Sequence, residues 1–402
     1  MKKYQIVILL VVMLLIILLS CKKSEDDNIV TPPPPPQVTG YALINGTLFD
    51  GVNSGLISDA VIIINNGLIQ DVGTSATIDL PDSMKTIDIQ GSYILPGFMN
   101  AHIHSGYDAN NLKEWAKAGV TSVRDVGNLS SSPEDGFNQR DNLMNDTMNA
   151  RLVAAGPLVT TVGGYGNFPV TSTDDAIEKT QGLIDAGADI IKIAIEDDLQ
   201  GQEWPLLPME QIKAIVQTTH DNNTRVAAHI SRAHHLYMAI QCGVDDVNHM
   251  AINSLHDSLI ALMIENNMYW VSTMELWQGV SEMYNINWDI IARNNLKRFS
   301  EAGGKVATGT DFGGYITPFQ LGMPITELKL MQEAGMTNEQ IIIASTKNAA
   351  YVCNMENELG TIEPDKIADI IVINENPLEN IEALLGIRMV IHNGRIIRDE
   401  TK

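Results

Sequence analysis

The sequence predicts an α/β protein: a TIM-type (β/α)8 barrel with a small β-sandwich domain built from both chain ends. Eight short apolar runs recur after residue 97, and helix-like stretches such as 173–186, 208–220 and 289–302 separate them. Polar residues able to do chemistry stand at the ends of several runs, where a barrel carries its functional side chains. Short strands with Asn-Gly turns gather at both ends of the chain.

The apolar runs and turn signals also set the expected domain boundaries. The eight barrel strands are expected at 98–102, 120–125, 152–155, 190–193, 226–229, 247–249, 269–273 and 306–311. Strands of the small domain are expected at 41–44, 60–64, 86–89, 368–373 and 389–392. We therefore assign 97–355 to the barrel, and 40–96 together with 356–402 to the β-domain.

The first 39 residues have the composition of a targeting signal followed by a tether. Lys2 and Lys3 precede the apolar run 6–19, which is short for a membrane-spanning helix and typical of a signal peptide. The stretch that ends in Ser20-Cys21 resembles a bacterial lipoprotein signal, which implies a cleaved peptide 1–20 and a lipidated Cys21. Residues 21–39 form an acidic, proline-rich tether. The alternative is an uncleaved membrane anchor.

Net charge limits the classes of binding partner, and cysteine content limits the disulfides that can form. The formal net charge is -23 at pH 7, with 49 acidic and 26 basic residues. Nucleic acid requires basic patches, so we expect no nucleic-acid binding and contact with the membrane only through the lipid. That anchor places the protein in the cell envelope, periplasmic or on the outer-membrane surface. Cys242 and Cys353 are expected as buried free thiols rather than a disulfide.

Residues with metal-ligand chemistry stand at the ends of four runs. His102 and His104 are two positions apart on one strand, so both imidazoles point to the same side. Lys192 lies inside an apolar run, where an ammonium is costly to bury unless Asp189 or Glu196 pairs with it. A lone histidine at a strand end is commonly structural, but five ligand positions in barrel order indicate a metal centre: His102, His104, His229, His249 and Asp311.

Several stretches resemble the amidohydrolase superfamily. The run 95–104 is similar to its first-strand signature, and 360–372 is similar to the return of the chain to the β-domain. Two further stretches, 121–127 and 188–193, look most like the prolidase-like branch of Xaa-Pro and Xaa-Arg dipeptidases. The resemblance spans roughly 40–398 and implies a metal-dependent hydrolase that cleaves an amide bond in a small peptide or N-acyl amino acid.

The resemblance also implies a role for each ligand residue. Two divalent ions are expected, with zinc as the default for a His-rich site. His102 and His104 would bind the buried ion, and His229 and His249 the second. Lys192 would react with carbon dioxide, and its carbamate would bridge both ions. The catalytic residue Asp311 would bind the first ion and act as general base towards a metal-bridged hydroxide.

Three positions that depart from the dipeptidase pattern are candidate substrate contacts. Tyr165 stands where many relatives have His, and Ser231-Arg232 stands where they have His-Gly. Arg232 is expected either to bind a substrate carboxylate with its fork of donors, or to lie on a helix surface beside Asp245 or Asp246. These changes alter the wall around the metal ligands and leave the substrate open.

Two other functions stay open from the sequence. One is a mononuclear hydrolase or deaminase of a cyclic amide or amine, similar to imidazolonepropionase; Lys192 argues against it, since mononuclear members generally lack that lysine. The other is a surface lipoprotein that only binds a ligand, which the complete ligand set disfavours. The expected partner is a small molecule or short peptide, and a homo-oligomer is left open.

Overall fold

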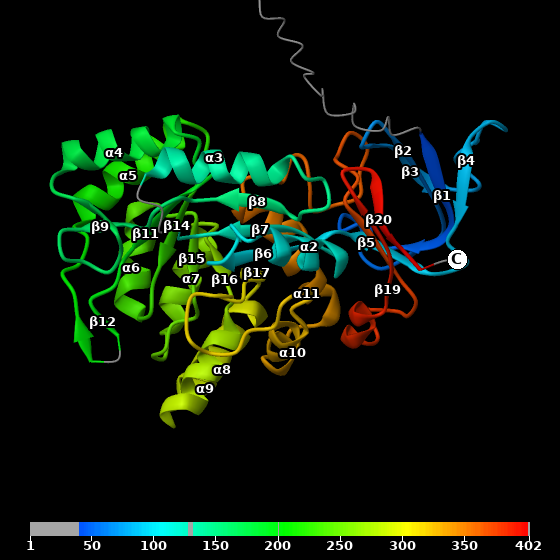
Figure 1. Ribbon diagram of the computed structural model, residues 1–402. Helices are drawn as coiled ribbons and strands as arrows, with labels where there is room; N and C mark the ends of the chain where they lie inside the picture. The colour runs from blue at the N-terminus through cyan, green and yellow to red at the C-terminus, as the bar shows by residue number, and fades with distance from the viewer. Residues whose placement is uncertain (1–39, 128–131, 200, 401–402) are drawn as a thin grey trace, which may run out of the picture. The chain divides into compact units, whose positions relative to one another are not determined.

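Eight parallel strands form the centre of the computed structural model, which describes residues 40–127, 132–199 and 201–400 (Figure 1). Parallel ladders join the first three strands to one another and the last five to one another. The predicted barrel strands are confirmed: β6 (Phe98–Ile103), β7 (Val120–Asp125), β8 (Arg151–Ala154), β11 (Ile191–Ala194), β14 (Val226–His229), β15 (Asp246–Asn248), β16 (Tyr269–Val271) and β17 (Lys305–Ala307).

Backbone hydrogen bonds join the two ladders into a ring. Between β8 and β11, the amide of Asp189 donates to the carbonyl of Ala154 at 3.0 Å. Between β6 and β17, the amide of Ala101 donates to the carbonyl of Thr308 at 2.8 Å. All eight strands run the same way, so their carboxyl ends meet at one rim.

Helices follow the strands and lie outside the ring (Figure 1). Ser172 caps α4, and buried Ala176, Thr180 and Leu183 recur at helical spacing along its inner face. The three helices expected at 173–186, 208–220 and 289–302 are each found within one residue. The helices are α2 (Ala109–Lys117), α3 (Pro133–Met144), α4 (Thr173–Asp185), α5 (Met209–Asp221), α6 (Ala233–Cys242), α7 (Asp257–Glu265), α8 (Met274–Tyr284), α9 (Trp288–Glu301), α10 (Ile325–Glu333), α11 (Asn338–Ser345), α12 (Lys347–Val352) and the 3-10 helix η1 (Ile381–Leu385).

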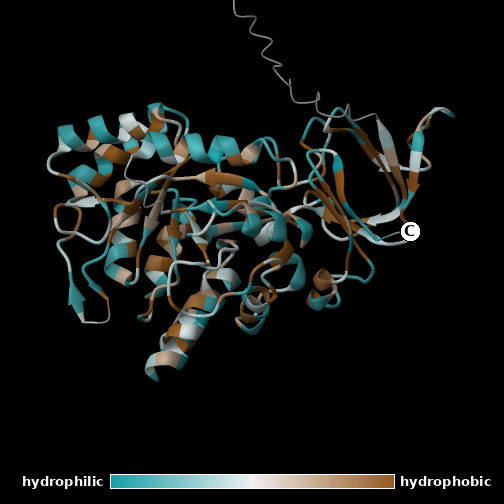
Figure 2. Cartoon of the chain, viewed as in Figure 1, coloured by the Kyte–Doolittle hydropathy of each residue, from teal (hydrophilic) through white to brown (hydrophobic). Residues whose placement is uncertain are grey.

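Both chain ends contribute strands to one eight-stranded sheet, as predicted. Its order is β20-β19-β18-β5-β1-β2-β3, with β4 beside β1. The ends join where β5 runs antiparallel to β18. Figure 2 shows hydrophobic residues along these strands. The strands are β1 (Tyr41–Leu48), β2 (Ile57–Asn65), β3 (Leu68–Thr74), β4 (Lys85–Asp88), β5 (Tyr93–Pro96), β18 (Ile370–Ile373), β19 (Ile387–His392) and β20 (Arg395–Asp399).

Two Asn-Gly turns hold this sheet together. Asn66-Gly67 joins β2 to β3, and Asn393-Gly394 joins β19 to β20. All four residues have positive φ, at 52°, 85°, 50° and 70°, as tight hairpin turns require. A Cβ on Gly394 would lie 2.5 Å from the Cα of Gly67. Only glycine permits these two hairpins to approach so closely.

A buried ion pair ties the small domain to the barrel. Asp369, just before β18, accepts from Arg151 of β8 at 2.7 Å and contacts His392 of β19 at 3.2 Å. Burial alone would raise the pKa of Asp369, but the charges and hydrogen bonds of Arg151 and His392 outweigh it and hold that pKa below its usual range.

Four short strands complete the barrel rim: β9 (Val159–Thr161), β10 (Phe168–Val170), β12 (Asp198–Leu199) and β13 (Gln202–Glu203). Strand β9 pairs with β11, and β12 forms a hairpin with β13. Cys242 and Cys353 are buried and free, as expected. The predicted signal peptide, Cys21 and tether lie outside the described residues. Within the described ranges, no helix is long and apolar enough to cross a membrane.

Candidate metal centre

A cavity of about 340 Å³ opens at the carboxyl ends of the barrel strands. Strands β6, β11, β14, β15 and β17 deliver its polar side chains, either from their last residues or from the segments just beyond. Lys192 is the exception, because it lies inside β11. The structure brings together all six residues predicted as metal ligands, since each lines this cavity: His102, His104, Lys192, His229, His249 and Asp311.

Three of these residues meet at one point. His102 Nε2 lies 3.0 Å from Asp311 Oδ1, and His104 Nε2 lies 3.2 Å from the same oxygen. The two imidazole nitrogens are 3.3 Å apart. Ligand atoms about 2.1 Å from a tetrahedral ion lie roughly 3.4 Å from one another. The spacing of these three atoms therefore fits one shared cation.

The backbone at this end of the barrel is locally strained. Asp311 has φ of 67° and His249 has φ of 76°, values uncommon for residues other than glycine. A Cβ on Gly314 would lie 2.4 Å from Asp311 Oδ1. Strain of this kind concentrates at functional sites, where the surrounding structure holds it in place.

His249 and His229 continue the cluster. The rings of His249 and His102 are 4.7 Å apart between centroids, and those of His249 and His229 are 4.8 Å apart. His249 Nδ1 lies 3.0 Å from the hydroxyl of Thr273, which orients the ring and leaves Nε2 for a metal. His249, His102 and Asp311 each offer a ligand atom within 4.8 Å of the other two.

The lowered pKa values of His102 and His249 suit a metal centre. Burial, and after it the charge of Lys192, lowers the pKa of His102 well below its usual value; burial and then His229 do the same for His249. Burial alone would lower the pKa of His104, but the hydrogen bond and charge of Asp311 raise it. His102 Nδ1 is buried and has no hydrogen-bond partner. Neutral imidazoles present lone pairs, so the donor set fits a divalent ion.

Within the described residues, Lys192 forms no ion pair with a carboxylate, although the charges of Asp246 and Asp311 act on it. Its Nζ contacts Asn248 Oδ1. The alternative of a salt bridge with Asp189 or Glu196 is wrong, because Asp189 pairs with Arg140 at 2.6 Å and Glu196 contacts His229. Burial, followed by the charge of Arg124, lowers the pKa of Lys192 well below its usual value. A neutral amine is the form that reacts with carbon dioxide.

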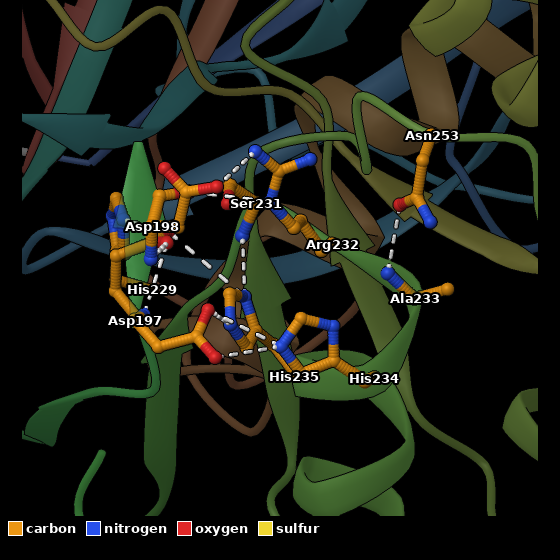
Figure 3. Close-up of polar contacts among 10 residues, drawn as sticks. Asp197, Asp198, His229, Ser231, Arg232, Ala233, His234, His235 and Asn253 are labelled. Atoms are coloured by element: carbon orange, nitrogen blue, oxygen red, sulfur yellow. Dashed lines mark hydrogen bonds and ion pairs between the residues drawn. The ribbon is translucent and has the colours of Figure 1, made fainter. Parts of the chain in front are cut away.

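The three candidate substrate contacts lie in different places. Tyr165 lines the cavity and stacks on His229, with ring centroids 4.5 Å apart. Ser231 is fully buried and does not line the cavity. Arg232 turns to Asp198 of β12, with Nη2 3.1 Å from the carboxylate (Figure 3). Its side chain therefore lies neither in the cavity nor beside the acidic pair 245–246.

Sequence reasoning missed two neighbours of the centre. Glu196 is 1% exposed, and its Oε2 lies 3.3 Å from His229 Nε2. The sequence carried a signal for Glu196, because it begins the acidic triplet 196–198 two residues beyond the strand that carries Lys192. Trp277 of α8 lines the cavity, with its ring centroid 5.9 Å from that of His249. No periodicity separates such a residue from the core.

The rest of the cavity wall is mainly apolar and aromatic, with Gln202 as a polar member. No arginine lines the cavity among the described residues, and Lys192 is its one basic side chain apart from the histidines. The wall therefore suits a substrate with an apolar or aromatic group. Its members are Val126, Leu158, Leu199, Trp204, Leu276, Trp277, Val280 and Tyr315.

Known proteins resemble this chain in sequence or in structure. The ochratoxinase of Aspergillus niger is 22% identical, with 84% of this chain and 82% of the relative covered. The imidazolonepropionase of Thermoplasma volcanium is also 22% identical, over 86% of this chain and 92% of the relative. A solved Xaa-Pro dipeptidase with methionine bound in its active site matches with a TM-score of 0.78 and 26% identity, over 89% of this chain and 99% of that one.

The family itself follows from a longer match. Residues 93–397 fit the model of the amidohydrolase family, which covers more than half of the chain. The structural likeness to dipeptidases supports the prolidase-like branch that the sequence indicated. Together with a cavity lined by His, Asp and Lys, these matches identify a metal-dependent hydrolase acting on C–N bonds. The chain therefore belongs to the amidohydrolase family.

Proposed function

We propose that the chain uses two divalent ions, by default zinc, to hydrolyse an amide bond in a small peptide or N-acyl amino acid. The single observation that carries the proposal is the convergence of all six predicted ligand residues on one cavity. A centre for one ion would not need Lys192, which is 2% exposed and, in the described part of the chain, contacts Asn248 rather than a carboxylate. As a carbamate, Lys192 would become an anion that two cations stabilise.

The chain's own residues divide the work. His102, His104 and Asp311 would hold one ion, while His229 and His249 would hold the other. Bound divalent ions acidify water and polarise a carbonyl. Asp311 stands at the meeting point of two histidines, so its carboxylate can take a proton there and pass it to the leaving amine. Tyr165 closes one side of the cavity by stacking on His229.

The cavity wall narrows the substrate class. Aromatic rings from Tyr165, Trp204 and Trp277 face the space beside the ligands, and no arginine lines it within the described part of the chain. We propose that an apolar or aromatic side chain beside the scissile amide gives most of the binding. Recognition of a substrate carboxylate by Arg232 has less support, because Arg232 already pairs with Asp198.

Metal analysis combined with a substrate screen tests the proposal. The purified chain should contain about two divalent ions, and it should hydrolyse dipeptides or N-acyl amino acids with aromatic side chains faster than their acidic counterparts. Lactones and cyclic amides complete the screen. Hydrolysis confined to cyclic amides by a protein with one tightly bound ion would contradict the proposal.

The alternatives make different predictions. A mononuclear cyclic-amide hydrolase or deaminase has the imidazolonepropionase relative in its favour, but its activity should survive the substitution Lys192→Ala. A surface lipoprotein that only binds would keep ligand affinity in Asp311→Asn and would show no turnover in either form. Both are less well supported, since neither uses the complete set of residues in the cavity.

We further propose a lipid anchor at Cys21 and a location in the cell envelope, either periplasmic or on the outer-membrane surface. The support is the sequence alone: an apolar run, a small residue and a cysteine, followed by the acidic tether. Metabolic labelling with a fatty acid should mark the wild type and not Cys21→Ala. Labelling that persists in the variant would refute the anchor.

A further inference from the structure

Three consecutive carboxylates follow β11 at the barrel rim, and the next strand exit supplies a basic partner for each. Glu196 contacts His229 of the centre, and Asp198 pairs with Arg232. Between them, Asp197 receives two imidazoles at once, from the adjacent residues His234 and His235 of α6 (Figure 3). Asp197 is the unusual carboxylate of the three, because two imidazoles contact it. The function proposed above does not use it.

The geometry around Asp197 is that of a converging donor set. His235 Nε2 lies 2.8 Å from Asp197 Oδ1, and His234 Nε2 lies 3.1 Å from Oδ2 and 3.2 Å from Oδ1. Each of the three residues offers one ligand atom within 4.8 Å of the other two. Neighbouring residues on a helix normally point about 100° apart. Here both rings instead turn to one carboxylate, with centroids 4.0 Å apart.

We propose that Asp197, His234 and His235 form a separate binding site for a divalent transition ion such as Zn²⁺, Co²⁺ or Ni²⁺. Two imidazole nitrogens and one carboxylate oxygen are a donor set that these ions favour, and Ca²⁺ and Mg²⁺ prefer oxygen alone. Without an ion, both rings donate Nε2–H to the one carboxylate. With the Nε2 protons removed, both lone pairs point to the same place, where one metal ion can accept them.

The neighbours of His235 can support metal binding. His235 is fully buried; its Nδ1 accepts from the amide of Ser231 at 3.4 Å and lies 3.9 Å from Glu196 Oε2. An ion on Nε2 would place the ring proton on Nδ1, so the ring would turn from the Ser231 amide towards Glu196 Oε2, which now lies 3.9 Å away. After that shift, Glu196 would accept the proton in the carboxylate–histidine–metal arrangement common in metalloproteins.

The outer side of the site is open to solvent. The side chain of His234 is 50% exposed and that of Asp197 is 33% exposed. An ion can enter there from solution, and water can complete its coordination. Glu196 touches both His235 and His229, so the site adjoins the catalytic centre and shares no ligand with it.

Counting ions in matched variants tests the site. The full chain is stripped with a chelator and dialysed against Zn²⁺, and bound zinc is measured per chain. His234→Ala and Asp197→Asn should each bind one ion fewer than the wild type. His220→Ala is the control, because His220 is another half-exposed histidine beside a single carboxylate, Asp245, at 2.9 Å. That variant should bind as many ions as the wild type.

The difference between variants separates this site from the catalytic centre. If the centre holds one ion rather than two, every count falls by one, and the deficit of His234→Ala against the wild type remains. Asp197→Asn preserves shape and tests the same point if the alanine variant fails to fold. Equal zinc content and equal half-saturation in the wild type and the folded variant would overturn the proposal and leave a hydrogen-bonded cluster.

Discussion

Two clusters of buried charge lie inside the same barrel and differ in how completely they are paired. Arg124 of β7 meets Asp246 of β15 through two parallel contacts, of 2.9 and 3.0 Å. Two further Arg124 donors reach the carbonyl oxygens of Ala101 and Val352, at 2.6 and 2.7 Å. Asn248 donates to Asp246 at 2.6 Å. The charges of this cluster cancel, and four of the five Arg124 N–H donors have an acceptor.

The second cluster is the metal centre, and it begins at the side-chain oxygen of Asn248. Asn248 Oδ1 contacts Lys192, and beyond it lie four histidines with one carboxylate, Asp311, among them. The pKa of Lys192 is lowered, and one nitrogen of His102 lacks a partner. A buried polar cluster without internal balance is costly to the fold. The comparison teaches that the balanced cluster serves stability, whereas the unbalanced one is shaped for cations.

The largest effect is expected from breaking the balanced pair. Arg124→Met leaves Asp246 buried without its partner, so the free energy of unfolding should fall by about 3–5 kcal/mol. Urea denaturation measures it. The double variant Arg124→Met/Asp246→Leu removes both charges and should regain much of the loss. A double variant as unstable as the sum of its single variants would show that the two residues do not stabilise each other.

The next effect concerns turnover rather than stability. Asp311→Asn keeps the shape and the left-handed backbone but removes the proton acceptor, so kcat should fall at least about a hundredfold with the fold intact. Asp365→Asn is the matched control, since Asp365 is an exposed aspartate with φ of 71°. Unchanged kcat in Asp311→Asn on a confirmed substrate would remove Asp311 from the mechanism.

A third substitution, Lys192→Met, should not lower the stability of the metal-free protein, in contrast to Arg124→Met. Lys192→Met replaces an unpaired amine with an apolar chain of similar size, so the metal-free protein should unfold at the same or a higher urea concentration. Zinc content should fall by one or two ions per chain. The control Lys305→Met changes an exposed strand lysine that also donates to an asparagine, Asn267. A large loss of stability in metal-free Lys192→Met would contradict the contrast drawn here.

The smallest expected effect is on the pH dependence of stability, through Asp369 at the junction of the two domains. Because the pKa of Asp369 is depressed in the fold, its stabilisation is present above the unfolded value and is lost as pH falls through the folded value. The wild type should therefore lose stability as the medium is acidified from about pH 5 to pH 3, and its advantage over Asp369→Asn should shrink. Urea midpoints at both pH values measure this. An advantage that stays constant would show that the ionised form is not what stabilises the junction.

Local patterns in the sequence determined the barrel strands and the ligands that follow them. Alternation along a strand puts His102 and His104 on one side, and apolar runs ending in His229 and His249 mark strand ends at the rim. Burial of Lys192 could be inferred from its apolar neighbours. These features depend on residues close in sequence, which is why a single chain was enough to predict them.

Only the tertiary structure decided which partners those residues meet. Arg124 and Asp246 are separated by 122 positions, and their pairing depends on the register of strands across the barrel. Asp198 pairs with Arg232, and Asp197 contacts two adjacent histidines, because the loop after β11 lies against the start of α6. Composition shows that such charges exist, but the path of the loop sets the distances between them, and that path depends on the packing of the whole barrel.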